Sequence, residues 1–141
     1  MLKFNETDLM ILARTIYGEA RGELKLANGG LQSLEAVAWV VKNRTRHKRF
    51  GESIVAVCLQ PWQFSCWNVN DPNRFELLHT TLENKILQTC FLSAANVLFD
   101  KVTDCTNGAD HYHSIRIKPP NWDKDLVPTA QIANHIFYKL G

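Results

Sequence analysis

The residues best suited to chemistry in this sequence lie in the stretch 12–23, LARTIYGEARGE. Apolar residues recur there with the spacing of one face of an amphipathic helix, at Leu9, Leu12, Ala13, Ile16, Tyr17 and Ala20. At 100° per residue, Glu19 lies about 20° from Leu12 around that helix, so its carboxyl borders the apolar face. Partial burial there would raise the pKa of the carboxyl toward the range of an acid catalyst. A solvated glutamate at a helix end gives the same pattern, and both interpretations stay open at this point.

A second carboxylate would be needed for the commonest glycosidase mechanisms, which place two acids about 5–5.5 Å or 6.5–9.5 Å apart. Glu23 is the nearest acid that follows Glu19. Gly22 precedes it and is expected to end the helix, so the spacing does not fix their separation. A glycosidase with one acid is also feasible when a substrate group acts as nucleophile, and muramic acid offers its own C6 hydroxyl.

Two histidines, His111 and His113, alternate with Tyr112 in a segment, 109–114, that is typical of a short strand. Both imidazoles would then lie on one face, a spacing that zinc sites use. With His135 or a cysteine they would form a ligand set suited to an amidase or peptidase. Because H-E-x-x-H and any second ligand cluster are absent, we favour polar residues that line a cleft and predict no metal cofactor.

The four cysteines, Cys58, Cys66, Cys90 and Cys105, form no C-x-x-C pair, and free thiols are expected. Cys66 is the one candidate for a nucleophile, although a packed thiol is favoured. It lies in a loop at 61–68, PWQFSCWN, that also carries Trp62, Phe64 and Trp67. Aromatic faces beside amides suit a carbohydrate ligand, but the same rings would equally anchor the loop in the core.

Composition indicates one soluble-type domain, 1–141, since 45% of the 141 residues are hydrophobic, 21% are charged and the net charge is +2. The basic run after residue 43, with Arg44, Arg46, Lys48 and Arg49, is interpreted as a solvated helix end, and no nucleic-acid partner is predicted. No apolar run reaches the ~20 residues of a membrane span, so no membrane insertion is expected. Glu6 and Asp8 stand where a secretion signal would be apolar, so synthesis in the cytoplasm is expected.

The remaining periodicity predicts helices over about 31–44 and 54–59, and a helical stretch over 74–99 with one break. The buried side of that stretch is predicted at Leu78, Leu82, Ile86, Cys90, Ala94, Val97 and Leu98. A closing helix is predicted over 130–139, begun by Thr129, with inward-facing residues Ile132, Ala133, Ile136 and Phe137.

Five segments together resemble the SleB/CwlJ family of cell-wall hydrolases. They are LARTIYGEARGE, EAVAWVVKNR, PWQFSCWN, TNGADHYHS with PPNWD, and IANHIFYK, and they occur in the family's order from about Asp8 to Lys139. The resemblance implies a mainly α (α+β) fold, a single lysozyme-like or lytic-transglycosylase-like domain with a small β element beside the cleft. It implies that the first glutamate of E-A-R-G-E, here Glu19, is the catalytic acid. The implied substrate contacts are Gln63, Phe64, Ser65, Trp67, His111 and Tyr112, with Glu23 as a possible second carboxylate.

The activity that this resemblance implies is cleavage of the β-1,4 bond between N-acetylmuramic acid and N-acetylglucosamine in peptidoglycan. Formation of a 1,6-anhydro product is favoured over hydrolysis, because no second carboxylate is clearly placed. The alternatives are a zinc-dependent N-acetylmuramoyl-L-alanine amidase and a catalytically inactive wall-binding module. A monomer acting on glycan strands of the cell wall is expected, and a lone domain without a leader also resembles a phage endolysin released by a holin. Two residues depart from the family pattern: Cys105 replaces a frequent proline and Ser33 a frequent glycine.

Overall fold

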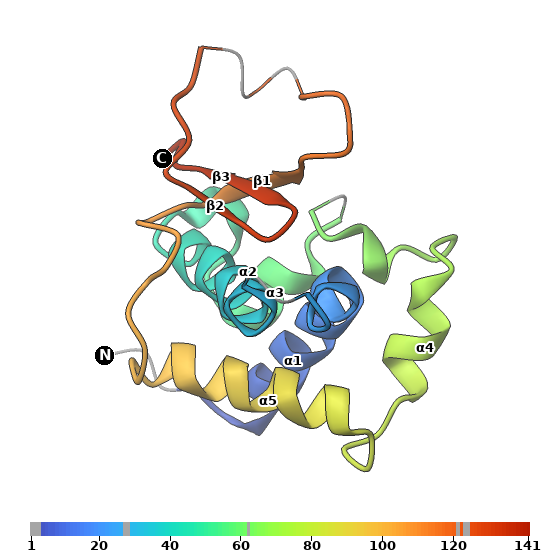
Figure 1. Ribbon diagram of the computed structural model, residues 1–141. Helices are drawn as coiled ribbons and strands as arrows, with labels where there is room; N and C mark the ends of the chain where they lie inside the picture. Colours follow the sequence, from blue (N-terminus) through green and yellow to red (C-terminus); the bar gives the residue numbers. More distant parts are fainter. Residues whose placement is uncertain (1–3, 27–28, 62, 121, 123–124) are drawn as a thin grey trace.

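The computed structural model describes residues 4–26, 29–61, 63–120, 122 and 125–141. Helices occupy most of the first hundred residues and three short strands follow (Figure 1). In chain order the elements are α1 (Glu6–Ala20), η1 (Arg21–Glu23), α2 (Gly30–Arg44), η2 (Lys48–Phe50), α3 (Ile54–Leu59), η3 (Ser65–Trp67), α4 (Asn73–His79), α5 (Lys85–Leu98), β1 (His111–Ser114), β2 (Ala130–Ile132) and β3 (His135–Tyr138). The sheet lies against one side of the helical body and α5 crosses the opposite side. This is the mainly helical fold with a small β element that was expected.

Helix α1 is the central helix, and it contacts α2, α3, α4 and α5. The centre of its apolar face is completely buried, with Leu12, Ala13 and Ile16 at 0% exposure, while Leu9 is partly buried. The helix begins at a capping box, in which Asn5 Oδ1 accepts from the Asp8 backbone N–H at 2.9 Å and Asp8 Oδ2 accepts from the Asn5 N–H at 3.1 Å. Since both ends of α1 are fixed by packing, its last turn holds Glu19 in a defined place.

Helices α2 and α3 form where the sequence predicts them. Helix α2 is buried on almost every side, as its continuous apolar centre indicates. Helix α3 begins at Ser53, whose hydroxyl accepts from the Ala56 N–H at 3.0 Å. Helix α2 contacts both α3 and strand β2, and so connects the helical body to the sheet.

The predicted break in the 74–99 helical stretch is confirmed between α4 and α5, but the predicted buried side is only partly correct. Cys90, Ala94, Val97 and Leu98 are buried, whereas Leu78, Leu82 and Ile86 are 40%, 41% and 37% exposed. Leu77 and Leu87 take the core positions instead, both at 0% exposure. The reason is that Thr80 is extended (ψ 137°), so the two helices do not share one phase.

The closing helix predicted over 130–139 is wrong, because this segment folds into the hairpin β2–β3. The sheet order is β1-β3-β2, with both pairings antiparallel. Ala133 adopts a left-handed conformation (φ 50°) at the turn, and Thr129 donates to the Phe137 carbonyl instead of capping a helix. Ile132, Ile136 and Phe137 suit a strand as well as a helix, and the short apolar run did not distinguish the two.

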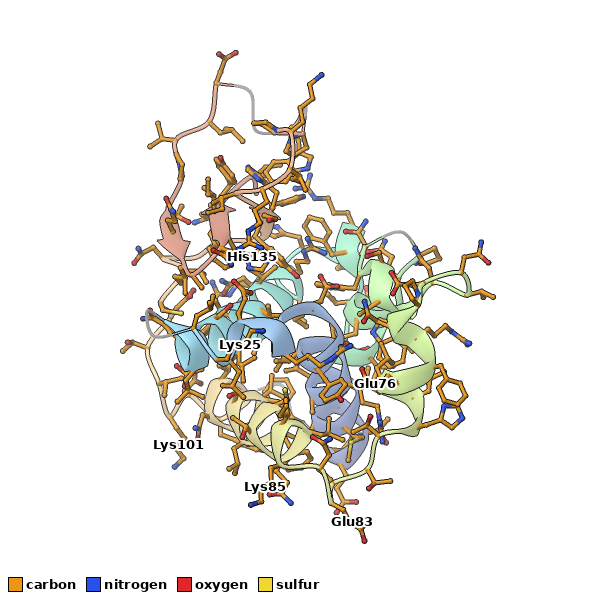
Figure 2. The ribbon with its side chains drawn as sticks, turned by 45° about the vertical axis from the view of Figure 1, so that its right-hand side comes forward. Lys25, Glu76, Glu83, Lys85, Lys101 and His135 are labelled. Atoms are coloured by element: carbon orange, nitrogen blue, oxygen red, sulfur yellow. The ribbon has the colours of Figure 1, made fainter. Side chains whose placement is uncertain are left out.

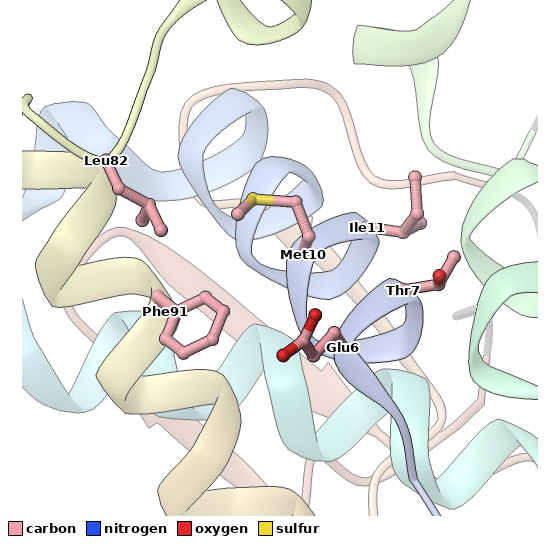
Figure 3. A pocket seen from close by; sticks show the side chains of 6 residues that line it. All are labelled: Glu6, Thr7, Met10, Ile11, Leu82 and Phe91. Carbon is pink, nitrogen blue, oxygen red and sulfur yellow. The ribbon is translucent and has the colours of Figure 1, made fainter.

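The apolar pocket in Figure 3 lies away from Glu19. It has a volume of about 470 Å³ and is lined by Glu6, Thr7, Met10, Ile11, Leu82 and Phe91. The α1 residues that line the pocket occupy the first turns of the helix. At a rise of 1.5 Å per residue, Glu19 lies roughly 20 Å from Glu6 along the helix axis. Among the residues that the structure describes, no helix has both the length and the apolar character needed to cross a membrane.

Candidate active site

Glu19 occupies the last turn of α1, where three separate elements meet. The Tyr112 hydroxyl of β1 donates a hydrogen bond to Glu19 Oε1 at 2.5 Å. The Cys66 thiol of η3 lies close enough to the same carboxyl to affect its electrostatics. The resemblance implies that the QFS loop and the H-Y-H strand flank the cleft. The structure brings Tyr112 of that strand into contact with Glu19 and places Cys66, which follows the QFS residues, near it.

Burial raises the pKa of Glu19 above the ordinary glutamate value. The charge of Asp71 raises it further, while the hydrogen bonds from Tyr112 and Cys66 and the charge of His135 lower it. Burial is the largest of these effects, so the protonated carboxyl is favoured. This is the electrostatic state that the position at the edge of the apolar face predicts, and it suits a general acid.

Glu23 belongs to a different element from Glu19, because α1 ends at Ala20 and the chain continues as η1. Glu23 is 8% exposed, and both oxygens of its carboxylate have polar partners. Ser33 Oγ donates to Oε2 and the Asn134 N–H donates to Oε1, both at 2.9 Å, and His135 Nδ1 lies 2.8 Å from Oε2. These contacts outweigh burial and lower the pKa of Glu23, so it stays ionised and connects η1, α2 and the hairpin. Figure 2 labels His135 where the sheet meets the helices.

The zinc ligand set that combined His111 and His113 with His135 does not form. In the β1–β3 register His135 pairs with Ser114, so it lies on the same face as Tyr112, opposite His111 and His113. His111 Nδ1 lies 2.9 Å from Asp110 Oδ1, and both strand histidines pack against the Trp122 ring. Within the described part of the chain, no group of three or more His, Cys, Asp or Glu side chains is placed to hold a metal ion.

Cys66, the one candidate for a nucleophile, has the wrong electrostatics for that role, and it is buried, as a packed thiol would be. Burial, the first cause, and the neighbouring Glu19 carboxyl raise its pKa well above the ordinary thiol value. The thiol therefore stays protonated. All four cysteines are unpaired, as expected, and Cys58, Cys66 and Cys90 are buried.

The aromatic loop is anchored in the core by one of its rings, and the carbohydrate-binding role that its sequence left open stays a prediction. Phe64 is 2% exposed and takes the core role, whereas Ser65 is exposed and Trp67 is half-buried. Trp67 donates from Nε1 to Thr15 Oγ1 at 2.9 Å, which fixes the loop to α1. A pocket of about 580 Å³ opens here, lined by Leu59, Gln60, Pro61, Phe64, Trp67, Asn68, Val69 and Asn70. Trp62 lies outside the described residues.

Arg44 is buried at 5% exposure, so the interpretation of the basic run as a solvated helix end is wrong for this residue. Its guanidinium lies between the rings of Phe50 and Phe64, with centroids at 5.1 and 5.0 Å. It donates from Nε to the Asp110 carbonyl at 2.7 Å and from NH1 to Gln63 Oε1 at 2.9 Å. Arg44 therefore holds Gln63, a predicted substrate contact, beside the start of β1.

Two further residues at this site were not singled out from the sequence. Asp71 acts on Glu19 through its charge, and its Oδ1 accepts from the Asn73 N–H at 2.8 Å at the start of α4. Ser33, noted only as a departure from the family pattern, is one of the two hydrogen-bond donors to Glu23. The sequence shows the turn Asp71-Pro72-Asn73 and the serine at position 33, but nothing in it places Asp71 or Ser33 near an acid.

The fold and this arrangement define a small, lysozyme-like domain with a buried acid between a loop and a sheet. The family model described as Cell Wall Hydrolase matches residues 30–138, and the chain belongs to that family, of the SleB/CwlJ type. The match begins after the segment that carries Glu19.

The chain is similar to one curated relative and to two solved structures. A spore cortex-lytic enzyme of Halalkalibacterium halodurans is 24% identical over 95% of this chain, and the chain spans 35% of that relative's length. The catalytic domain of SleB from Bacillus cereus superimposes with a TM-score of 0.77 at 22% identity, covering 99% of this chain and 94% of that one. The catalytic domain of a germination-specific lytic transglycosylase, SleB of Bacillus anthracis, gives 0.75 at 22% identity, with 99% of each chain covered.

Proposed function

We propose that this cell-wall hydrolase is a glycosidase that cleaves the β-1,4 bond between N-acetylmuramic acid and N-acetylglucosamine, with Glu19 as its general acid. The observation that carries the proposal is the burial of Glu19, which favours a protonated carboxyl and outweighs the opposing hydrogen bond from Tyr112. The partners of that carboxyl come from the two segments, 61–68 and 109–114, that carry the predicted sugar contacts.

In the first step Glu19 gives its proton to the glycosidic oxygen as the bond to the muramic C1 breaks. The carboxylate that remains then takes the proton of the muramic C6 hydroxyl, whose oxygen attacks C1 and closes a 1,6-anhydro ring. The proton given by Glu19 leaves on the departing hydroxyl of N-acetylglucosamine, the proton of the C6 hydroxyl restores the acid, and no water is consumed.

We favour this anhydro-forming route over hydrolysis because of the state of Glu23. A retaining or inverting glycosidase would use a second carboxylate as nucleophile or base. The Glu23 carboxylate is occupied by Ser33, Asn134 and His135, which leaves it poorly placed for either task. The relative from Bacillus anthracis is described as a lytic transglycosylase, which supports the same choice.

Two measurements on purified peptidoglycan test this function. Glu19→Gln keeps the shape of the side chain and removes its proton, so lytic activity should fall by at least ~10²-fold. Glu52→Gln changes an exposed glutamate and should leave activity unchanged. Full activity of the Glu19 variant would refute the assignment of the acid.

Mass spectrometry of the digest identifies the bond and the route. Anhydro-muramic ends, one water lighter than hydrolysed ends, are expected. Hydrolysed muramic ends would instead support a muramidase, and release of stem peptides without new sugar ends would contradict a glycosidase altogether.

A further inference from the structure

We propose that Tyr112 and Cys66 are positioning residues that act together through Glu19, fixing the orientation of its carboxyl and stabilising the charge that it acquires on giving up its proton. The inference rests on the proposed role of Glu19 as the acid. It assigns to Cys66 a function in the reaction, and to Tyr112 a function other than contact with the sugar.

The geometry brings two groups that carry a hydrogen near one carboxyl, from elements far apart in the sequence. Tyr112 donates to Oε1 at 2.5 Å, and Cys66, 1% exposed, packs against Gly18, the residue directly before Glu19. Burial, together with the nearby Glu19, raises the pKa of both groups, that of Tyr112 well above its ordinary value. Both therefore keep their hydrogens at the pH of the reaction and are available as donors.

Each donor is held rigidly by packing. The Tyr112 ring meets the edge of His135, with centroids 5.0 Å apart, and lies 5.5 Å from the Phe137 ring on the same face of the sheet. Cys66 packs directly against Gly18 of α1. Donors fixed before the reaction need no reorganisation when charge develops, which is the condition for effective electrostatic stabilisation.

A hydrogen bond to a carboxylate is stronger than the same bond to a neutral carboxyl. The two donors therefore stabilise the state after proton transfer more than the state before it, and this lowers the barrier. The charged groups that act on Glu19 from other elements are His135 of β3 and Asp71 before α4, and buried Arg44 of α2 interacts with it as well. His135 adds to the effect of the donors and Asp71 opposes it.

The titration of the Glu19 carboxyl, followed by ¹³C NMR without substrate, tests the inference directly. Tyr112→Phe and Cys66→Ala each remove one donor and should move the Glu19 titration to higher pH. Cys66→Ser keeps a donor and should leave it close to that of the unmodified protein. Tyr138→Phe, on the opposite face of the sheet, and Cys90→Ala, in the core, are matched controls that should not move it. Subtracting the spectrum of Glu19→Gln identifies the signal.

Kinetics on soluble glycan chains provides the second measurement. We expect kcat to fall about 10- to 100-fold for Tyr112→Phe and Cys66→Ala, the scale of a lost hydrogen bond to a charged group, with KM little changed. A raised KM with an unmoved Glu19 titration would make Tyr112 a sugar contact and overturn its part of the inference. Equal shifts for Cys66→Ser and Cys66→Ala would show that Cys66 acts through packing alone and overturn its part. Because the titration needs no substrate, it still tests the effect of Tyr112 and Cys66 on Glu19 if full activity of Glu19→Gln disproves the proposed function.

Discussion

Gly18 and Cys66 approach so closely that no side chain fits between α1 and η3. A Cβ atom added at Gly18 would lie 2.7 Å from Cys66 Cβ and 2.8 Å from Cys66 Sγ, and 3.0 Å from Leu77 Cδ2. Real Cβ atoms do not approach other atoms so closely, and both Cys66 atoms belong to a short, buried side chain. A glycine directly before Glu19 is thus what lets η3 reach the carboxyl.

Gly18→Ala should therefore displace Cys66 from Glu19. Overpacking of this kind costs about 1–3 kcal/mol, which exceeds the gain of up to about 1 kcal/mol in helix propensity. We expect a net loss of stability in urea unfolding and a fall of about 10-fold or more in lytic activity.

Gly22→Ala is the control for this change. Gly22 is exposed and an added Cβ would meet nothing within 4 Å, so stability should stay the same or rise by about 0.4–1 kcal/mol. Gly18→Ala with full activity and stability would contradict the close packing.

Much of the fold could be predicted from local sequence signals. The Asn5 and Ser53 caps, the all-apolar centre of α2 and the break before α5 are decided by neighbouring residues. The hairpin at the end of the chain could not be predicted so well. Ile132 and Phe137 satisfy a helical spacing, and the strand state depends on pairing with β1, which precedes them by about twenty residues.

The features of the site also divide into those that follow from local sequence signals and those that depend on distant segments. The position of Glu19 at the edge of the apolar face of α1 follows from the period of one helix, and the structure confirms partial burial. The burial of Arg44, the partners of Glu23 and the thiol contact of Cys66 depend on residues brought together from distant segments. No periodicity carries that information, so the interpretation of Arg44 as solvated is wrong, whereas the prediction of a packed Cys66 thiol is confirmed.

Arg44→Met should lower the free energy of unfolding by removing the hydrogen bonds to Gln63 and Asp110, while an apolar side chain still fills the buried position. The change leaves Gln63 Oε1 and the Asp110 carbonyl without their donor, at about 1–3 kcal/mol for each buried unpaired group. Burial of the guanidinium lowers its pKa, so removing the charge recovers part of that cost, and a net loss of about 1–3 kcal/mol is expected.

Urea unfolding with Arg46→Met as control measures this effect. Arg46 is exposed, so its replacement should change stability by less than about 0.5 kcal/mol. If both variants behaved alike, the buried position of Arg44 would be contradicted.

Asp71→Asn should move the pH dependence of lytic activity toward acid. This is opposite to the shift of the Glu19 titration expected for Tyr112→Phe or Cys66→Ala. The charge of Asp71 raises the pKa of Glu19, so its removal lowers that pKa. Activity that depends on protonated Glu19 should then be lost at lower pH, and the alkaline limb of the pH–rate profile should move toward acid. Loss of all activity of the variant at every pH, with hydrolysed ends in the digest made by the original protein, would instead identify Asp71 as a second catalytic carboxylate.

Glu19→Gln should be more stable than the original protein at pH 8. Burial raises the pKa of Glu19 in the folded state, so between the ordinary value of about 4.3 and that raised value the folded chain binds more protons than the unfolded chain. Stability contributed by the protonated acid is therefore lost as pH rises through the folded pKa. Urea midpoints at pH 4 and pH 8 should show a difference that grows with pH, and equal midpoints at pH 8 would argue against burial of this carboxyl.

Glu23→Gln should have the opposite pH dependence. The contacts of Glu23 lower its pKa in the folded state, so its stabilising contribution is complete above about pH 4.3 and is lost as pH falls through the lower folded value. At pH 7 the variant should lose about 1–3 kcal/mol, the cost of weakening hydrogen bonds to a buried charge, and the difference should shrink toward pH 3. Ser33→Ala removes one of the donors and should lose less stability.

Lytic activity of folded Glu23→Gln should exceed that of Glu19→Gln by a wide margin. The reason is that the Glu23 carboxylate joins η1 to the hairpin and takes no part in the proton transfer that Glu19 performs. An equal loss in the two variants would mean that both carboxylates take part in the reaction.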